Sequence, residues 1–328
     1  MTGQNAAAGP ARGEEAADRE ADGSGRIRLG LIGAGRMGRT HLTAIAGSRM
    51  VTVPGVVEPD PGTRAAVAAA GTPAYATLDE LLAAADLDGA IIAAPTNRHV
   101  EVLGEVMAAG LPALCEKPCG LSEDEATLCA GVAAAAGLVL QVAYWRRFVP
   151  ALTELRRRML DGELGDILAV NCYQWDATPP PAGFRGASGG IYVDMGVHEF
   201  DQVRWLTGQE FTSIKTAAAA GESDPDCAQI VAELDGGSTA MVSLGRWHPA
   251  GDSCKVEVFG TKGTVSSWFL VPAGGEATFH EALRLQAEDF ARSVAGSQAA
   301  GASVADAIEA LRIASMAEAG TSQLATSQ

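Results

Sequence analysis

Residues 27–38 read IRLGLIGAGRMG, a short apolar run that leads directly into a glycine-rich turn. The apolar run predicts a strand buried on both faces, and the Ala-rich residues 36–47 predict the helix that follows. In such a turn Gly33 permits the tight bend, Gly35 lets a pyrophosphate approach the backbone, and Gly38 lets helix and strand pack closely. The helix N-terminus then offers unpaired N–H groups to phosphates. Strand, turn and helix together predict a dinucleotide-binding unit with the binding residues Gly33, Ala34, Gly35, Arg36, Met37 and Gly38.

The next predicted strand, MVTVPGVVE at residues 50–58, ends on an acidic residue. Glu58 lies twenty residues beyond Gly38, where an acid accepts hydrogen bonds from the adenosine ribose hydroxyls. A carboxylate there repels a 2′-phosphate, and residues 59–62 contain no Arg or Lys. The sequence therefore favours NAD over NADP as the cofactor. The alternative interpretation is a glycine-rich turn followed by an unrelated acid.

Apolar runs and Ala-rich stretches continue to alternate as far as about residue 145. Further strands are predicted at 88–95, 111–117 and 138–144, and further helices at 60–70, 97–109 and 122–136. Ser122 and Glu125 are spaced as a capping box for the last of these helices. Strands that alternate with helices predict a doubly wound parallel sheet, and thus a Rossmann domain over residues 26–148.

The pattern changes after Phe148. An amphipathic helix is predicted within residues 151–165, ending near Gly162 or Gly165. Beyond it come β-rich runs that only one helix, near 195–207, interrupts. Strands in succession without crossover helices predict an α+β domain on a mostly antiparallel sheet, at residues 149–328. Two C-terminal helices, predicted at 279–295 and 302–319, are expected to pack back on the body of the protein.

Composition argues against several classes of protein. The 328 residues carry a formal net charge of −16 without a basic run, which argues against nucleic-acid binding. No apolar stretch reaches the roughly 18 residues of a membrane-spanning helix, and the N-terminus lacks an apolar signal core. The six cysteines show no zinc-like spacing, so we expect reduced thiols in a cytoplasmic protein. Residues 1–25 are polar and unpatterned, and we expect a disordered tail there.

Three polar residues are candidates for proton transfer. Lys117 ends a predicted strand, at the edge of the sheet where doubly wound folds bind ligands, and a lysine there can shuttle or polarise a hydroxyl proton. Asp194 and His198 are four residues apart, so both face the same side at the start of a helix. Histidine suits proton transfer near neutral pH, and a carboxylate can orient it. The alternatives are an ordinary surface lysine and a structural histidine.

Three further segments follow the glycine-rich turn in a fixed order. They are APTNRH at 94–99, CEKP at 115–118, and SGG at 188–190 followed by DMGVHEFD at 194–201. With the turn, they resemble the GFO/IDH/MocA family of sugar and cyclitol dehydrogenases from about Arg26 to Gly263. The resemblance implies that NAD oxidises a secondary hydroxyl to a ketone, with Lys117, Asp194 and His198 as catalytic residues. It also implies that the cofactor is lined by Pro95, Thr96, Asn97, His99, Glu116 and Lys117.

Two of these expectations have structural alternatives. His99 could instead lie on the surface of its helix, and His41 in the first helix is interpreted as a packing residue. A divalent metal held by Asp194, His198 and Asp201 is a rival interpretation of that cluster. We expect no metal, because nicotinamide-dependent alcohol oxidation needs none.

Segments of the second half are similar to the inositol dehydrogenase branch of this family: YWRRF at 144–148, WDATPPP at 175–181, and SGGI at 188–191. A polyol offers many hydroxyls to hydrogen-bonding side chains. The expected substrate-binding residues are Lys117, Trp145, Arg146, Asp176, Asp194, His198 and Asp252. For Arg146 or Arg147 the alternative is a salt bridge between the domains.

The loop WHPAGD at 247–252 departs from that branch, which carries tyrosine there. The additional carboxylate of Asp252 favours a cationic substituent, such as the amine of an aminocyclitol or aminosugar. Two further hypotheses stay open: a dehydrogenase of a nucleotide-linked sugar and a non-catalytic NAD-binding sensor. The expected partner is a small polyol or sugar, with neither nucleic acid nor membrane. The family resemblance implies a homodimer or homotetramer.

Overall fold

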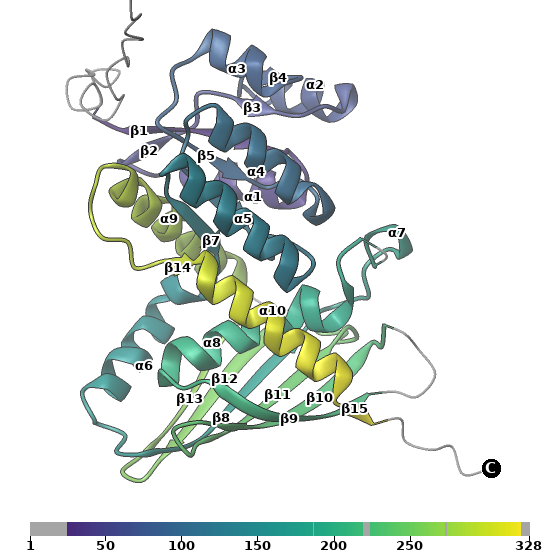
Figure 1. Ribbon diagram of the computed structural model, residues 1–328, viewed down its shortest axis with the longest axis vertical. Helices are drawn as coiled ribbons and strands as arrows, with labels where there is room; N and C mark the ends of the chain where they lie inside the picture. Colours follow the sequence, from purple (N-terminus) through teal and green to yellow (C-terminus); the bar gives the residue numbers. More distant parts are fainter. Residues whose placement is uncertain (1–24, 186, 219–223, 273, 323–328) are drawn as a thin grey trace, which may run out of the picture.

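A computed structural model of the protein describes residues 25–185, 187–218, 224–272 and 274–322. The predicted tail lies outside these residues except for Gly25. Figure 1 shows two parts stacked along the long axis, an upper one with helices around a sheet and a lower one with a broad sheet. The expected fold class, a Rossmann domain followed by an α+β domain on a mostly antiparallel sheet, is confirmed.

The upper sheet is parallel apart from one short strand at its edge. Its order is β14 (Ala302–Ser303), β7 (Leu140–Ala143), β6 (Ala113–Glu116), β5 (Gly89–Ile92), β1 (Ile27–Ile32), β3 (Val56–Val57) and β4 (Ala74–Tyr75), with β2 (Val51–Thr52) also paired to β1. The helices that follow its strands are α1 (Arg36–Ile45), α2 (Pro61–Ala69), α3 (Leu78–Ala84), α4 (His99–Ala108) and α5 (Glu123–Ala136). Because the strands run parallel, their carboxyl ends meet at one edge, where ligands bind in such folds.

The lower sheet carries its helices on the side that faces the upper part. Its order is β13 (Thr264–Leu270), β12 (Ser253–Gly260), β8 (Ile167–Trp175), β11 (Thr239–Gly245), β10 (Cys227–Leu234), β9 (Phe211–Ala218) and β15 (Thr321–Ser322). Its neighbours are antiparallel, apart from the parallel pairs β8–β11 and β9–β15. The remaining helices are α6 (Pro150–Leu160), α7 (Ala182–Arg185), α8 (Val197–Thr207), α9 (Gly275–Val294) and α10 (Val304–Ala319). Helices α6, α8 and α10 lie between the lower sheet and the upper part (Figure 1).

The C-terminal segment returns to the upper part, as expected, and enters its sheet. Phe290 of α9 is fully buried and belongs to the same apolar cluster as Leu29 and Leu31 of β1. The short strand β14 then pairs antiparallel with β7. The segment after residue 149 therefore supplies both the lower sheet and the last edge strand of the upper one.

Several local predictions need correction. The predicted strand at 50–58 is two short strands, because Pro54 lacks an N–H and Gly55 packs against Leu81 too closely for a larger residue. The capping box of α5 is only half formed. The Ser122 hydroxyl accepts the N–H of Glu125, but the Glu125 carboxylate accepts the N–H of Leu121 instead of that of Ser122.

Several helix boundaries differ from the prediction or were missed. Helix α3 was not predicted, although the Thr77 hydroxyl accepts the N–H of Glu80 in an N-cap that the sequence displays. A complete capping box begins α10, where Ser303 and Asp306 bond each other's backbone N–H groups. Residues 96–98 form a 3₁₀ turn before α4. Helix α6 ends at Leu160, close to Gly162, the earlier of its two predicted ends.

Other features of the chain agree with its composition. All six cysteines carry free thiols, and five of them are buried. None of the helices in the described ranges is long and apolar enough to cross a membrane.

Candidate active site

The glycine-rich turn after β1 leaves room for a cofactor on one side only. Gly33 has φ +100°, and a Cβ atom there would lie 2.6 Å from the Ala93 carbonyl oxygen. A Cβ atom on Gly38 would lie 2.0 Å from the Gly33 carbonyl oxygen, so only glycine permits this contact between helix and turn. Nothing lies within 4 Å of a Cβ atom placed on Gly35, which leaves open space where a pyrophosphate would approach.

The first turn of α1 suits an anion. Its N-cap Gly35 provides no side-chain cap, and the first turn contains no acidic residue, so the N–H groups there are available to phosphate oxygens. The Glu58 carboxylate closes the other end of this site. It accepts the N–H of Ala34 at 2.8 Å and that of Asp60 at 3.0 Å. These residues fit a dinucleotide whose adenosine ribose lies against Glu58.

The guanidinium group of Arg64 lies near Glu58 and was not predicted from the sequence. Arg64 lies two residues beyond the segment 59–62, in α2. Its Nη1 donates to the carbonyl oxygens of Glu58 and Pro59 at 2.8 and 2.9 Å. Two backbone acceptors thus engage the guanidinium, while the carboxylate of Glu58 keeps its place beside the turn.

His99 ties together the two loops that follow β5 and β6. Its Nδ1 lies 2.7 Å from the Pro118 carbonyl oxygen, and its Nε2 lies 2.9 Å from that of Ala94. The ring is 1% exposed, and burial lowers its pKa. The interpretation of His99 as a helix-surface residue is therefore wrong. A direct contact of His99 with the cofactor stays a prediction, as it does for the accessible Pro95, Thr96 and Asn97.

Glu116 and His41 form a buried pair beneath the cofactor turn. His41 Nε2 lies 2.7 Å from Glu116 Oε1, and both side chains are at least nine-tenths buried. Burial alone would raise the pKa of Glu116, but the hydrogen bond and charge of His41 hold it below its usual value. The second oxygen of Glu116 accepts the N–H of Lys117 at 3.2 Å. His41 therefore is not a packing residue only, because its contact with Glu116 joins α1 to the end of β6, directly before Lys117.

The structure brings Lys117 and Asp194 together across 77 residues of sequence. Lys117 Nζ donates to the Asp194 carbonyl oxygen at 2.7 Å and lies 3.5 Å from its carboxylate oxygen Oδ1. Asp194 lies in a π-helical turn, residues 192–196, that leads into α8. Both side chains keep 17–18% exposure, so the pair is reachable from solvent without being surrounded by it.

His198 lies one turn further along, as the spacing of four residues predicts. Its Nδ1 is buried without a hydrogen-bond partner among the described residues. The rings of Tyr144 and Trp145 approach it edge-on, with centroids at 6.0 and 6.3 Å. Burial, with the charges of Lys117 and Arg146, lowers the pKa of His198 well below its ordinary value of 6.5. The imidazole is therefore neutral near pH 7, which is the form that accepts a proton.

Asp176 and Asp252 hold each other's loops in place. Asp252 Oδ1 accepts the N–H of Ala177 at 2.8 Å, and the N–H of His248 binds the Asp176 carbonyl oxygen at 2.9 Å. Burial and the carboxylates of Asp252 and Asp194 raise the pKa of Asp176, whereas a hydrogen bond from Gln174 opposes the shift. Asp176 therefore lies within electrostatic reach of the carboxylates of Asp194 and Asp252 and of the ammonium group of Lys117.

Trp145, Arg146 and Arg147 are largely buried. Arg146 is 2% exposed, with Nη1 at 2.5 Å from Glu199 Oε1 and Nη2 donating to Gln174 at 2.7 Å. Trp145 is also buried, so a substrate contact from either residue stays a prediction. Arg147 forms an ion pair, as the alternative interpretation expected, with Asp201 at 2.5 Å. Because both oxygens of Asp201 bind that guanidinium, they are engaged away from any metal.

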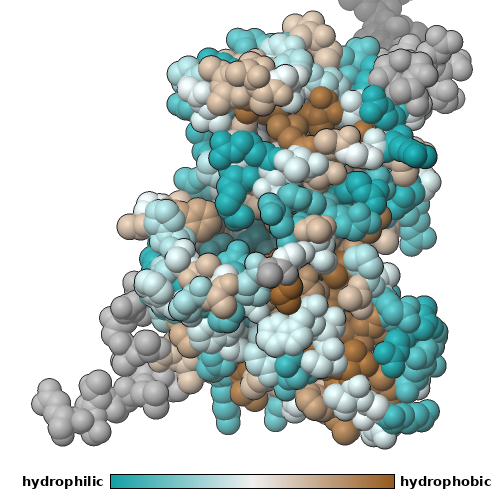
Figure 2. Space-filling view, turned by 180° about the vertical axis from the view of Figure 1, so that it is seen from behind, coloured by the Kyte–Doolittle hydropathy of each residue, from teal (hydrophilic) through white to brown (hydrophobic). Residues whose placement is uncertain are grey.

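No group of three or more His, Cys, Asp or Glu side chains is arranged to hold a metal ion in the part of the chain that the structure describes. Figure 2 shows the surface hollowed where the upper and lower parts meet, with hydrophilic side chains around the recess.

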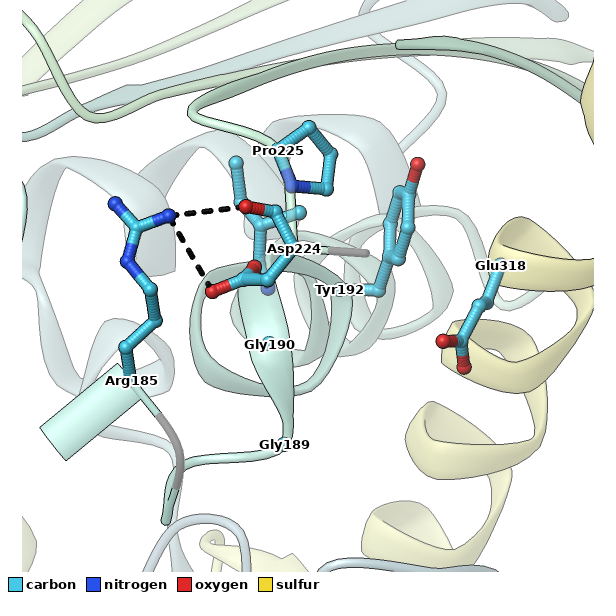
Figure 3. Close-up of a pocket in the computed structure, with 8 residues that line it drawn as sticks. Arg185, Gly189, Gly190, Tyr192, Asp224, Pro225 and Glu318 are labelled. Atoms are coloured by element: carbon cyan, nitrogen blue, oxygen red, sulfur yellow. Dashed lines mark hydrogen bonds and ion pairs between the residues drawn. The ribbon is translucent and has the colours of Figure 1, made fainter. Parts of the chain in front are cut away.

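A separate cavity of about 240 Å³ lies beside the segment that precedes Asp194. Its lining residues include Arg185, Gly190, Asp224 and Glu318, and it contains none of the three predicted catalytic residues. Figure 3 shows Arg185 reaching both the carbonyl oxygen and the carboxylate of Asp224. The sequence analysis missed Asp224, together with its second partner, Arg246.

Fold and site together are those of an NAD-binding oxidoreductase, because the Rossmann cofactor turn and the contact of Lys117 with Asp194 lie at the same sheet edge. Two family models match the chain. Residues 27–144 match the oxidoreductase family with an NAD-binding Rossmann fold, and residues 152–266 match the GFO/IDH/MocA C-terminal domain. The chain belongs to the GFO/IDH/MocA family.

Its similarity to named members extends over most of the chain. It is 46% identical to the rhizopine catabolism protein MocA of Rhizobium meliloti, over 89% of this chain and 94% of that protein. It is 32% identical to an inositol 2-dehydrogenase of Rhizobium meliloti strain 1021, over 74% and 75% of the two chains. The crystal structure of myo-inositol 2-dehydrogenase from Lactobacillus plantarum superposes with a TM-score of 0.80 at 25% identity, covering 90% of this chain and 98% of that one.

Proposed function

We propose that this protein is an NAD-dependent dehydrogenase that oxidises a secondary hydroxyl of a cyclitol or sugar to a ketone. The observation that carries the proposal is the contact between Lys117 and Asp194, with a neutral His198 one helical turn away. A protein that only binds NAD has no need for a proton relay at this edge. The similarity to proteins named inositol 2-dehydrogenase supports a polyol as the substrate.

Three residues of this chain have separate roles in removing the proton from the substrate hydroxyl. Bound NAD supplies the acceptor for the hydride that leaves the carbinol carbon. Lys117 donates a hydrogen bond to the hydroxyl oxygen and stabilises its developing negative charge. The neutral imidazole of His198 accepts the hydroxyl proton. Asp194 fixes the ammonium group of Lys117 through its carbonyl and carboxylate oxygens.

The experiment is to incubate the protein with NAD and a panel of cyclitols, sugars and nucleotide-linked sugars while NADH absorbance is followed. The proposal expects an absorbance rise with at least one cyclitol or free sugar. Turnover of nucleotide-linked sugars alone would replace the substrate class. Tight NAD binding without turnover of any compound would favour the non-catalytic sensor.

The pH dependence of turnover tests the role of His198. Because its pKa lies well below 6.5, the imidazole stays neutral and able to accept a proton below that pH. We expect the part of the kcat/KM profile that depends on His198 to fall only below pH 6.5. The variant His198→Gln should lose that dependence and about 10²- to 10⁴-fold in kcat. A His198-dependent fall at or above pH 6.5 would contradict this assignment.

A second candidate substrate is an amino-substituted cyclitol or sugar. The carboxylates of Asp194 and Asp252 both lie within electrostatic reach of Asp176, whereas neutral hydroxyls need no such charge. Asp252 is exposed and uses only one carboxylate oxygen for its bond to Ala177. Its charge is therefore free to attract an ammonium group on the substrate.

The variant Asp252→Asn is expected to lower the preference for an amino substrate over its hydroxyl analogue about 5-fold, the range of one partly screened charge pair. Asparagine keeps the oxygen that accepts the Ala177 N–H, so the loop should stay in place. The measurement is the ratio of kcat/KM values for the two substrates, with Asp79→Asn on exposed α3 as a matched control. An unchanged ratio would remove Asp252 from substrate selection.

The predicted homodimer or homotetramer belongs to the same proposal. The open face of the lower sheet carries exposed apolar side chains, including Trp268 at 58% and Val231 at 56% exposure. Burial of such side chains favours association, and a second copy of the chain is the partner that the family resemblance implies.

A further inference from the structure

Arg246 directly follows β11 in the chain. It lies fully inside the protein, close to Asp194. Its side chain is 0% exposed, and Nη1 lies 2.7 Å from Asp224 Oδ2. Nη2 lies 4.0 Å from Asp194 Oδ2, and neither Nη2 nor Nε has a hydrogen-bond partner among the described residues. The two oxygens of the Asp194 carboxylate therefore face two different cations, Lys117 at Oδ1 and Arg246 at Oδ2.

Asp224 connects the same arginine to the backbone before Asp194. Its Oδ2 binds Arg246, and its Oδ1 accepts the N–H of Ile191 at 2.8 Å. Ile191 immediately precedes the π-helical turn that contains Asp194. Arg185 also approaches Asp224, with Nη1 at 3.7 Å from Oδ2 (Figure 3), so two guanidinium groups face this carboxylate.

We propose that Arg246 is a positioning residue that holds the Asp194 carboxylate toward Lys117 and thereby sets the direction of the Lys117 ammonium group. The inference rests on the proposed dehydrogenase function for its kinetic consequence. Because Arg246 is completely buried, it acts through Asp194 and does not touch the substrate.

The charges around Asp194 explain why a guanidinium is suited to this position. Lys117 and Arg246 are the cations that face its carboxylate, while Asp176 repels it and the neutral His198 lies one turn away. Without Arg246, no cation among the described residues would hold Oδ2, so the carboxylate could rotate and the repulsion by Asp176 would turn Oδ1 away from Lys117. The planar fork of an arginine can hold Asp224 and attract Asp194 at once, which a lysine cannot do with one nitrogen.

A double-mutant cycle tests this inference with Arg246→Met, Asp194→Asn and the combined variant. Arg246→Met alone should lower kcat about 10- to 100-fold, the range of coupling within one ion-pair network. In the Asp194→Asn background the same change should cost less than about 3-fold, because its target is already neutral. The affinity for NAD should stay within about 3-fold, since Arg246 lies away from the cofactor turn. Equal losses in both backgrounds would show a merely structural role and overturn the inference.

Two further variants keep the test decisive. Arg246→Lys retains the charge and should recover part of the lost kcat, and it replaces the methionine variant in the cycle if the latter does not fold. Arg185→Met removes the other guanidinium from Asp224 without approaching Asp194, and its kcat should fall less than that of Arg246→Met. A loss from Arg185→Met as large as that from Arg246→Met would also overturn the inference.

A readout without turnover separates this inference from the proposed function. Crystal structures of the protein and of its Arg246→Met variant report the distance from Lys117 Nζ to Asp194 Oδ1, which is 3.5 Å in the unchanged protein. We expect the carboxylate to turn in the variant and this distance to lengthen. If no polyol is oxidised, the proposed function fails, while the distance alone decides the positioning role. An unchanged distance would contradict it.

Discussion

The variant Lys117→Met is expected to lower kcat/KM for the polyol substrate by about 10²- to 10⁴-fold, the usual contribution of a positioned proton-transfer group. Methionine keeps much of the apolar stem of lysine, so packing at the end of β6 changes little. What disappears is the ammonium group that binds Asp194 and the substrate hydroxyl. The measurement is steady-state NADH formation at several pH values.

The controls for this prediction separate chemistry from folding. Lys117→Met should bind NAD within about 10-fold of the unchanged protein, because one hydrogen bond is the most it could lose there. Lys215→Met removes an exposed lysine from β9, and its turnover should match that of the unchanged protein. Full activity of Lys117→Met would exclude Lys117 from proton transfer.

The second large effect is expected from Gly38→Ala, which should lower the affinity for NAD by at least about 100-fold, since the helix that binds the phosphates must move. The new Cβ atom would lie 2.0 Å from the Gly33 carbonyl oxygen, which is far inside contact distance. Both α1 and the turn would have to shift, and with them the N–H groups that face the pyrophosphate. The measurement is NAD binding by calorimetry or by protein fluorescence.

Two other glycines serve as matched controls. Gly47→Ala, just beyond the end of α1, places its Cβ in open space and should leave NAD binding unchanged. Gly35→Ala also meets no protein atom within 4 Å, so the protein should keep its stability and lose affinity only because a methyl group faces the cofactor. Equal affinity in the Gly38 and Gly47 variants would contradict the assignment of this turn to NAD.

The sequence predicted the parts of the site that local pattern encodes. The glycine-rich turn and Glu58 depend on one strand, one turn and one helix, whose spacing is visible in a short segment. Lys117 could be placed because parallel strands present their carboxyl ends at one edge. The placement of Asp194 and His198 one helical turn apart followed from their spacing. The expected contact of the carboxylate with the imidazole is not seen in the described ranges, because Asp194 faces Lys117 and Arg246.

The remaining parts depend on contacts between distant residues, which no local pattern encodes. His41 contacts Glu116 across 75 residues of sequence, and Arg246 approaches Asp194 from just beyond the end of β11. Strand β14 consists of two residues whose pairing with β7 comes from the return of the chain. Arg146 was expected at the substrate, but a buried glutamate on α8 engages it. The carboxylate of Glu199 gave no signal in the sequence beyond its place in the DMGVHEFD segment.

The central claim is that Lys117, Asp194 and His198 form the centre that oxidises a cyclitol hydroxyl. A crystal structure of the protein with NAD and myo-inositol tests it most directly. We predict a hydroxyl of the inositol within hydrogen-bond reach of Lys117 Nζ and His198, and its carbon about 3.5 Å from the nicotinamide ring, the separation of reacting atoms. Inositol bound elsewhere, with Lys117 and His198 both away from any of its hydroxyls, would contradict the claim.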